Sequence, residues 1–459
     1  MLELNRESKT PIYQQIYDQL KDQIISGALK AHERLPATRT LAQDYHISRN
    51  SVLNAYQQLE SEGFISSKIG SGFYVEELPE SSKQNEKESN IQNVENEEKT
   101  YRYDFRYGSI EPNFYQTRVF RKALKEALND LEEKTILNDP EAQGLFSLRQ
   151  QIVEHLREVR GVDCHPKQIV ITGGHRYSLN LLAELFDCQD YDVAIEDPGH
   201  ADVRQVFEKA SYDIHPIPLD ESGIRIDRIR KLSHCLVCLT PSHQFPLGMI
   251  LPIARRFQLL QWAKENDGYI IEDDYDSELR YRERPIPALY SLDSHDRVIY
   301  LGSFSKSLSP DLRVSYIVFP SSVSLPAQSF HSGTSLLIQM TLANYLKSGE
   351  YHKRINRMRN SLRKKHNRII DFFHENYHDR IKIYGIGGGS HFVLEIPTKK
   401  KDLLKIFHEE NVGVYPIDDL YFDRNRNREN LIMIGYSGIP LKQLNEYLIH
   451  LKTAIDRLI

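Results

Sequence analysis

Apolar residues near the N-terminus recur with helical periodicity. In "TPIYQQIYDQLKDQIIS", residues 10–26, Thr10 and Pro11 suit the cap and the first turn of a helix, and Gly27 follows its last turn. The apolar face of this helix consists of Tyr13, Ile16, Tyr17, Leu20 and Ile24. We therefore expect one amphipathic helix here.

Two further helical patterns and a hairpin follow. "TRTLAQDYH" predicts a second short helix capped by Thr38, and "SRNSVLNAYQQLESEG" predicts a third helix capped by Ser48. In the third helix, Val52, Tyr56 and Leu59 share the inward face. The tight joint at residues 46–48 is typical of a helix-turn-helix. "FISSKIGSGFYVEE" then predicts two short strands around a turn that contains glycine.

A polar segment separates these elements from the rest of the chain. Residues 76–100, "EELPESSKQNEKESNIQNVENEEKT", hold almost no apolar side chains, so burial cannot offset the entropy lost on ordering. We predict a flexible linker at 77–102, between an N-terminal domain at 1–76 and a larger domain at 103–459.

Beyond the linker, short apolar runs alternate with amphipathic segments. The runs are "QIVIT", "VAIED", "CLVCLT", "YIIEDD", "RVIYLG" and "SYIVFP". This alternation favours an α/β domain with a mostly parallel sheet. The stretch from about 336 to 459 opens with a basic helix and ends in "HFVLEI" and "LIMIGYS", which predicts a smaller α+β subdomain.

Composition narrows the protein class. The 459 residues exceed the size of a single core, no apolar run approaches membrane-spanning length, and the first residues lack a secretory pattern. We expect a cytoplasmic protein of two or three domains with no membrane partner. "CLVC" at 235–238 admits a metal or redox interpretation, but residues three apart in a strand point to opposite faces. We therefore expect buried thiols and no metal site.

The charge balance gives no general signal for nucleic acid. The net charge is −5, and residues 1–75 carry eight Lys/Arg and eight Asp/Glu, so DNA binding must depend on locally presented groups. Recognition helices contact base edges with their first residues. The third helix presents Arg49 there, which suits guanine, and Asn50, which suits adenine. The alternative is a protein-interaction module with ordinary surface arginines.

Residues 9–75 closely resemble the winged helix-turn-helix of the GntR family. "RLPATR", "SRNSV", "LESEG" and "GSG" occur in the family's order and spacing. The resemblance implies binding to a double-stranded DNA operator, with Arg34, Arg39 and Lys68 on phosphates. The complete set of candidate DNA-binding residues is Arg34, Arg39, Ser48, Arg49, Asn50, Lys68 and Gly70.

A lysine follows one of the predicted strands, in "SFSKSLSPDLR" at 303–313. A lone loop lysine is usually a solvated surface residue, but three other predicted strands also end in polar clusters. One precedes a Gly173–Gly174 turn and a helix, whose first amides suit a phosphate. The second ends in "EDPGH", and the third in "EDDYD". Each cluster alone is ordinary, whereas the set indicates one binding site.

This set, in this order, resembles the fold-type I aminotransferases, which use pyridoxal 5′-phosphate. The resemblance runs from about residue 103 to the C-terminus. It implies that Lys306 forms a Schiff base with the cofactor, that Asp273 pairs with the pyridine nitrogen, and that Tyr275 donates to the phenolic oxygen. It also implies phosphate contacts and a residue stacked on the ring: Gly174, His175, Ser303, Ser305 and Arg313 for the phosphate, and His200 for the ring.

A winged helix joined to such a domain resembles the MocR/GabR family of transcription regulators over essentially the whole chain. The resemblance implies a head-to-tail homodimer that senses a small amine or amino acid, or the cofactor itself, through an aldimine at Lys306. The rival hypothesis is an active aminotransferase that carries a DNA-binding domain. A purely structural domain without cofactor conflicts with the intact set of site residues.

Some positions depart from a working transaminase. Met433 lies near the place where such enzymes have an arginine for the substrate carboxylate, and His200 replaces a more usual aromatic residue. Arg424, Arg426 and Arg428 are nearby substitutes. The basic helix at 351–370 has two interpretations: a solvated surface helix, which we favour, or a second DNA contact.

Overall fold

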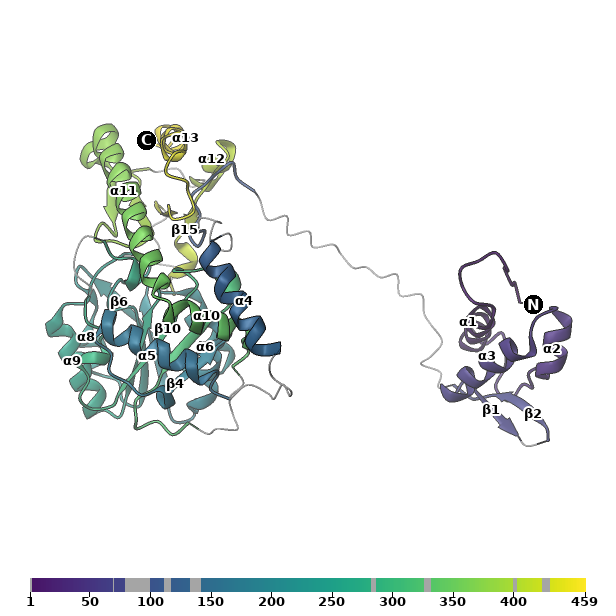
Figure 1. The fold of residues 1–459 in the computed structure, drawn as a ribbon. Coiled ribbons are helices and arrows are strands. Elements are labelled where there is room, and N and C mark those ends of the chain that lie inside the picture. Colours follow the sequence, from purple (N-terminus) through teal and green to yellow (C-terminus); the bar gives the residue numbers. More distant parts are fainter. Residues whose placement is uncertain are drawn as a thin grey trace. The chain divides into compact units, whose positions relative to one another are not determined.

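The computed structural model describes residues 2–68, 70–78, 100–110, 117–132, 142–281, 286–325, 332–398, 403–422 and 430–459. The chain divides into two compact units, Met1–Glu98 and Lys99–Ile459 (Figure 1). Most of the linker predicted at 77–102 lies outside the described residues. Among the described helices, none has the length and apolar character needed to cross a membrane.

The N-terminal unit contains three helices and a hairpin. The helices are α1 (Ile12–Ile25), α2 (Thr38–Asp44) and α3 (Arg49–Ser61), and the antiparallel strands are β1 (Ile65–Lys68) and β2 (Gly72–Val75). Their shared core includes Ile16, Val52, Tyr56 and Leu59, all fully buried. The periodicity of the sequence therefore predicted both the helices and the faces that pack together.

Two predicted helix caps are wrong by one residue. Pro11 occupies the cap position of α1 and Ala37 that of α2, so neither Thr10 nor Thr38 caps its helix. Both cap residues have extended backbones and provide no side-chain cap hydrogen bond. The third cap is as predicted, because the Ser48 hydroxyl accepts a hydrogen bond from the amide of Asn50 at 3.1 Å.

The larger unit is built on an eight-stranded sheet. Its strand order is β4 (Ile169–Thr172), β11 (Ser315–Val318), β10 (Val298–Ser303), β9 (Tyr269–Asp274), β8 (Cys235–Leu239), β5 (Asp192–Asp197), β6 (Ile214–Asp220) and β7 (Gly223–Ile224). The five strands from β10 to β6 are parallel, whereas β11 and β7 are antiparallel to their neighbours. The mostly parallel sheet is confirmed. Strand β6 was not among the predicted strands, because two prolines interrupt its apolar pattern in "IHPIPLD".

Helices cover both faces of this sheet (Figure 1). Ile169 and Ile171 of β4 pack in a core with α5 (Phe146–Arg160), α4 (Arg118–Glu132) and α10 (Leu336–Lys347). Val170, on the opposite face, packs with Leu179 and Leu182 of α6 (His175–Leu185). The described part of this subdomain also contains α7 (Ala201–Lys209), α8 (Ile226–Ile229) and α9 (Ile253–Glu265).

A smaller subdomain follows along α11 (Glu350–Tyr377). Its antiparallel sheet has the order β12 (Lys382–Tyr384), β13 (His391–Glu395), β16 (Leu431–Gly435) and β15 (Tyr415–Pro416), and it carries α12 (Leu403–Glu409) and α13 (Leu444–Asp456). A separate pair joins β14 (Val412–Gly413) to β3 (Tyr103–Asp104). The boundary expected at about 336 needs correction, because Leu342 and Tyr345 of α10 pack in the core of the large sheet.

The cap at Ser48 leads to a prediction about α3. Removing a side-chain cap costs about 1 kcal/mol, so Ser48→Ala should accelerate hydrogen exchange of the first-turn amides of α3 roughly fivefold. Residue-resolved exchange on the full chain measures this. Ser48→Asn, which retains a capping oxygen, should exchange like the wild type. Equal exchange in wild type and Ser48→Ala would show that the hydroxyl does not stabilise this turn.

Candidate functional site

The first turn of α3 presents the predicted base-contacting residues to solvent. Ser48 keeps an extended backbone, and its hydroxyl holds the amide of Asn50, so the helix begins at Arg49. Arg49 and Asn50 are both exposed. This is the placement that a recognition helix requires, since its first residues enter the groove.

The hairpin carries a second exposed basic group. Lys68 lies at the end of β1, with Nζ 4.8 Å from the centre of the Tyr74 ring. The guanidinium of Arg34 lies against Gly72, where a Cβ would be 3.3 Å from Nε. Gly70, at the turn, has a φ of +77°, which favours glycine. The structure thus brings Arg34, Lys68 and Gly70 together at the β1–β2 hairpin, whereas Arg39 is exposed on α2.

Lys306 lies beside a cavity of about 130 Å³ at the carboxyl ends of β9 and β10. Its Nζ lies 3.8 Å from the centre of the Tyr107 ring. Burial lowers the pKa of Lys306 to about 8, and Asp276 opposes that shift. The cavity brings together seven residues predicted for one site: Lys306, Asp273, Tyr275, His200, His175, Ser303 and Ser305.

Asp273, the second-last residue of β9, lines this cavity, and its Oδ2 lies 2.8 Å from Nε2 of His175. Burial alone would raise the pKa of Asp273, but His175 outweighs burial and holds that pKa below its ordinary value. Burial likewise opposes the charged form of His175, and Asp273 raises the pKa of that imidazole overall. The Oδ1 atom of Asp273 makes no hydrogen bond with a described residue. It is therefore available to a ligand.

Serines and an arginine surround the start of α6. The Ser303 hydroxyl accepts hydrogen bonds from the amide of Ser305 and the hydroxyl of Ser315, both at 3.1 Å. The guanidinium of Arg313 lies against Gly174, where a Cβ would be 2.7 Å from Nη2. Gly174 has a φ of +107° and precedes the first residue of α6. Only glycine lets the guanidinium approach the helix start this closely, which makes the cluster suitable for an anion.

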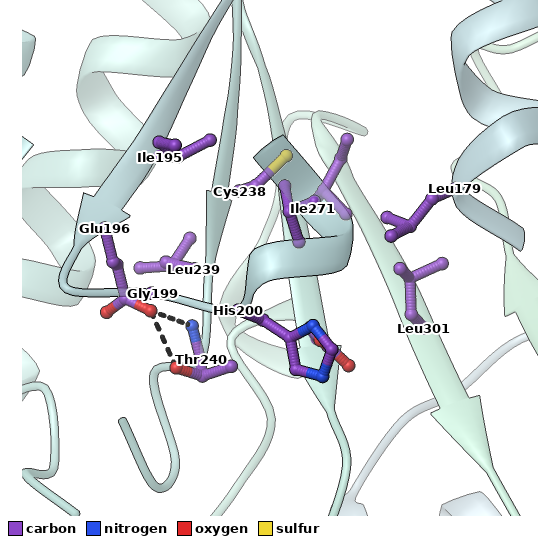
Figure 2. A pocket seen from close by; sticks show the side chains of 12 residues that line it. Leu179, Ile195, Glu196, Gly199, His200, Cys238, Leu239, Thr240, Ile271 and Leu301 are labelled. Atoms are coloured by element: carbon purple, nitrogen blue, oxygen red, sulfur yellow. Dashed lines mark hydrogen bonds between the residues drawn. The ribbon is translucent and has the colours of Figure 1, made fainter. Parts of the chain in front are cut away.

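His200 caps α7, where its Nδ1 accepts from the amide of Asp202 at 3.2 Å. Its ring lies between His175 and Phe245, with ring centres 5.1 and 5.2 Å away. Figure 2 shows this imidazole at the edge of a small cavity lined by apolar side chains and by Glu196, which Thr240 holds through two hydrogen bonds. Burial lowers the pKa of His200 to about 4, so its ring is neutral at physiological pH.

Tyr275 lies at the cavity wall beside a buried pair. Its hydroxyl is 2.9 Å from Nδ1 of His243, which is also 2.9 Å from Oδ2 of Asp276. His243 and Asp276 are both buried, and Nε2 of His243 has no hydrogen-bond partner among the described residues. Burial raises the pKa of Tyr275 well above its ordinary value, so this group is a hydrogen-bond donor.

Two residues near Lys306 were not predicted from the sequence. Tyr107 packs on Lys306, and His391, buried in β13, lies 4.9 Å from Tyr107 between ring centres. Neither belongs to a polar cluster at a strand end, which was the signal that identified the other residues. His243 lies within "TPSHQFPLG", the segment that directly follows β8.

Met433 is fully buried in β16, in an apolar cluster with Phe245 and Val393. This position therefore offers no cation for a substrate carboxylate. The proposed substitutes Arg424, Arg426 and Arg428 lie outside the described residues.

Three residues near the cavity could ligate a metal ion, but two of them already pair with other side chains. His175, His200 and Asp202 have ligand atoms within 4.8 Å of one another, the spacing of a metal site. His175 binds Asp273, however, and Asp202 pairs with Arg176 at 2.7 Å. Of the "CLVC" thiols, Cys235 and Cys238 are free and buried in cores on opposite sides of the sheet, as the strand pattern predicted.

Comparison with protein families divides the chain in the same way. Residues 12–75 match the model described as "Bacterial regulatory proteins, gntR family". Residues 110–433 match the model described as "Aminotransferase class I and II".

Full-length relatives carry both parts. The HTH-type transcriptional regulator YdeL of Bacillus subtilis is 36% identical over 98% of this chain and 98% of its own. The pyridoxine biosynthesis regulator PdxR of Corynebacterium glutamicum is 33% identical, with 87% and 86% of the two chains covered. The probable rhizopine catabolism regulatory protein MocR of Rhizobium meliloti is 29% identical, with 99% and 96% covered.

Solved aminotransferases share the fold of the larger unit. A kynurenine aminotransferase of Pyrococcus horikoshii has a TM-score of 0.69 at 23% identity, covering 79% of this chain and 92% of its own. LysN, an α-aminoadipate aminotransferase of Thermus thermophilus, has a TM-score of 0.68 at 26% identity, covering 77% and 92%. Its structure contains N-(5′-phosphopyridoxyl)-L-leucine.

The lowered pKa of Lys306 leads to a prediction about its reactivity. Acetic anhydride attacks only the neutral amine, so the acetylation rate of Lys306 should rise about tenfold per pH unit below 8 and level off above it. Mass spectrometry of peptides from the full chain measures this rate. Free Nα-acetyl-lysine should keep accelerating to about pH 10. A Lys306 that follows the free amine would contradict the burial of its ammonium group.

Proposed function

The chain belongs to the MocR/GabR-type transcription regulators, and on that premise we propose that it binds DNA through its N-terminal unit and pyridoxal 5′-phosphate at Lys306. The ligand that it senses is a small amine or amino acid, or the cofactor itself. The observation that carries the proposal is that Lys306 and Asp273 line the same cavity.

The donor set fits this cofactor. Arg313, Ser303, Ser305 and the first amides of α6 would hold its phosphate, since Gly174 leaves the guanidinium room beside the helix start. The unengaged Oδ1 of Asp273 would accept from the protonated ring nitrogen, and His175 would keep that carboxylate charged and oriented. When bound, pyridoxal phosphate supplies an aldehyde that condenses reversibly with amines and a ring that withdraws electrons.

The side chains around Lys306 support its role as the attacking amine. With a pKa of about 8, a substantial fraction of Lys306 is neutral at physiological pH, whereas an ordinary lysine is almost entirely protonated. Tyr107 and His200 both line the same cavity, so their rings limit the orientation of a flat ligand.

Met433 favours regulation over turnover. An α-amino acid aminotransferase must hold the substrate carboxylate in a fixed orientation. The position at which such enzymes have an arginine for this purpose is occupied here by the buried Met433. We infer that a ligand amine displaces Lys306 without being processed efficiently. The resulting change biases the DNA-binding heads of a head-to-tail homodimer.

The first test is an absorbance spectrum of the full chain with added pyridoxal phosphate. The wild type should acquire the visible band that this aldehyde gains on reaction with a protein amine, and Lys306→Ala should not. Lys209→Ala, which removes an exposed lysine on α7, should retain the band. A colourless wild type would overturn cofactor binding at Lys306, and steady conversion with a keto acid would favour an aminotransferase.

The second test concerns the DNA-binding unit. A duplex selected from a random pool by the wild type should bind Arg49→Ala roughly tenfold to hundredfold more weakly, because a contact to a base is lost. Lys68→Ala should weaken binding to selected and unrelated duplexes about equally, as expected for a phosphate contact. Fluorescence anisotropy at fixed salt measures both. Unchanged affinity of Arg49→Ala for the selected duplex would contradict the recognition role of α3.

A further inference from the structure

Two buried residues beside the Lys306 cavity take no part in the cofactor contacts proposed above. They are His243, in the segment 240–248 that follows β8, and Asp276, which follows Tyr275 after the end of β9. Each is 4% exposed. Tyr275 itself lines the cavity, so two neighbouring strand ends bring an imidazole and a carboxylate against a residue of the cavity wall.

The distances define which nitrogen of His243 carries a hydrogen. Its Nδ1 lies 3.0 and 2.9 Å from the two carboxylate oxygens of Asp276, and 2.9 Å from the hydroxyl oxygen of Tyr275. A carboxylate only accepts hydrogen bonds, so the Nδ1 that faces both of its oxygens is a donor. A nitrogen that donates cannot accept as well. The hydroxyl of Tyr275 therefore does not donate to His243, and its hydrogen is left for another acceptor.

The imidazole also occupies the acceptor that would compete for this hydrogen. Burial raises the pKa of Tyr275 well above its ordinary value, and the negative charge of Asp276 adds to that shift. Tyr275 thus keeps its hydrogen, and a buried carboxylate nearby attracts any donor within reach. Because the N–H of His243 engages both oxygens of Asp276, the hydroxyl of Tyr275 remains available to the cavity.

The surrounding structure holds His243 in this orientation. The amide and hydroxyl of Thr240 both donate to the buried Glu196, at 2.9 and 2.7 Å, and the Thr240 hydroxyl accepts from the amide of Phe245 at 2.9 Å. From the small subdomain, Gly389 covers the imidazole with a φ of +85°, and a Cβ there would overlap Cε1 of His243. The ring therefore cannot turn away unless the backbone moves.

We propose that His243, held by Asp276, is a positioning residue that directs the hydroxyl hydrogen of Tyr275 into the Lys306 cavity. It thereby makes the site selective for a ligand that has an oxygen acceptor opposite Tyr275, such as the phenolic oxygen of a pyridoxal compound. This inference rests on the cofactor site proposed above and adds to it the origin of one element of its selectivity.

The experiment compares two ligands that bind without a covalent bond to Lys306. They are pyridoxamine 5′-phosphate and its 3-deoxy analogue, which lacks the phenolic oxygen, and calorimetry on the full chain measures both affinities. The wild type should prefer the phenolic compound about tenfold, as one buried hydrogen bond predicts. Tyr275→Phe and His243→Leu should each reduce this preference below about twofold. His243→Asn should retain most of it, because its amide nitrogen can replace Nδ1 as the donor to Asp276.

A second variant and a control accompany this comparison. Asp276→Asn keeps the shape of the side chain but can donate to Nδ1, which favours the tautomer that accepts from Tyr275, so it should also lower the preference. Asp202→Asn removes another carboxylate that lines the cavity, one that pairs with Arg176, and should leave the ratio of the two affinities unchanged. If His243→Leu weakens both compounds equally, its role is only structural and the proposal is overturned.

The hydrogen on Nδ1 can be observed without any ligand. In the full chain labelled with ¹⁵N-histidine, the signals that disappear in His243→Asn belong to His243, and they should show a hydrogen on Nδ1. A bare Nδ1 would overturn the positioning role even if the cofactor binds at Lys306. A wild type that binds neither compound would instead overturn the cofactor site, and this inference with it.

Discussion

The larger unit is organised around three consecutive buried carboxylates at the end of β9. Glu272, Asp273 and Asp274 are each less than one tenth exposed, and burying a charge is costly unless a partner compensates. Amides of residues 289 and 290 bind Glu272, His175 binds Asp273, and Arg160 lies 2.7 Å from Asp274. These partners come from different helices and loops, so burying the three carboxylates ties those segments to the end of β9. His175 and Asp273 both line the Lys306 cavity, so their pairing also fixes one part of its wall.

The sequence predicts such a structure best where local pattern and tertiary burial agree. The central strands are short apolar runs, and their polar ends mark Asp273, His200 and Lys306 before any contact is known. The sequence does not predict features that depend on contacts between residues far apart in the chain. Tyr107 packs on Lys306 across 199 positions of sequence, and β6 is held in the sheet despite its prolines by pairing with β5. Met433 was noticed only because a resemblance pointed to it, and its burial needed the structure.

The short pairing of β3 with β14 has a mechanical consequence. The amides of Tyr103 and Phe105 donate to the carbonyls of Asn411 and Gly413, and the amide of Gly435 donates to the carbonyl of Phe105. Residues 103–105, which make these bonds, precede Tyr107 in the sequence, and the ring of Tyr107 contacts Lys306. The pairing thus anchors this segment of the chain to the small subdomain before it reaches Tyr107, so the position of Tyr107 over Lys306 depends on the small subdomain as well as on the large sheet.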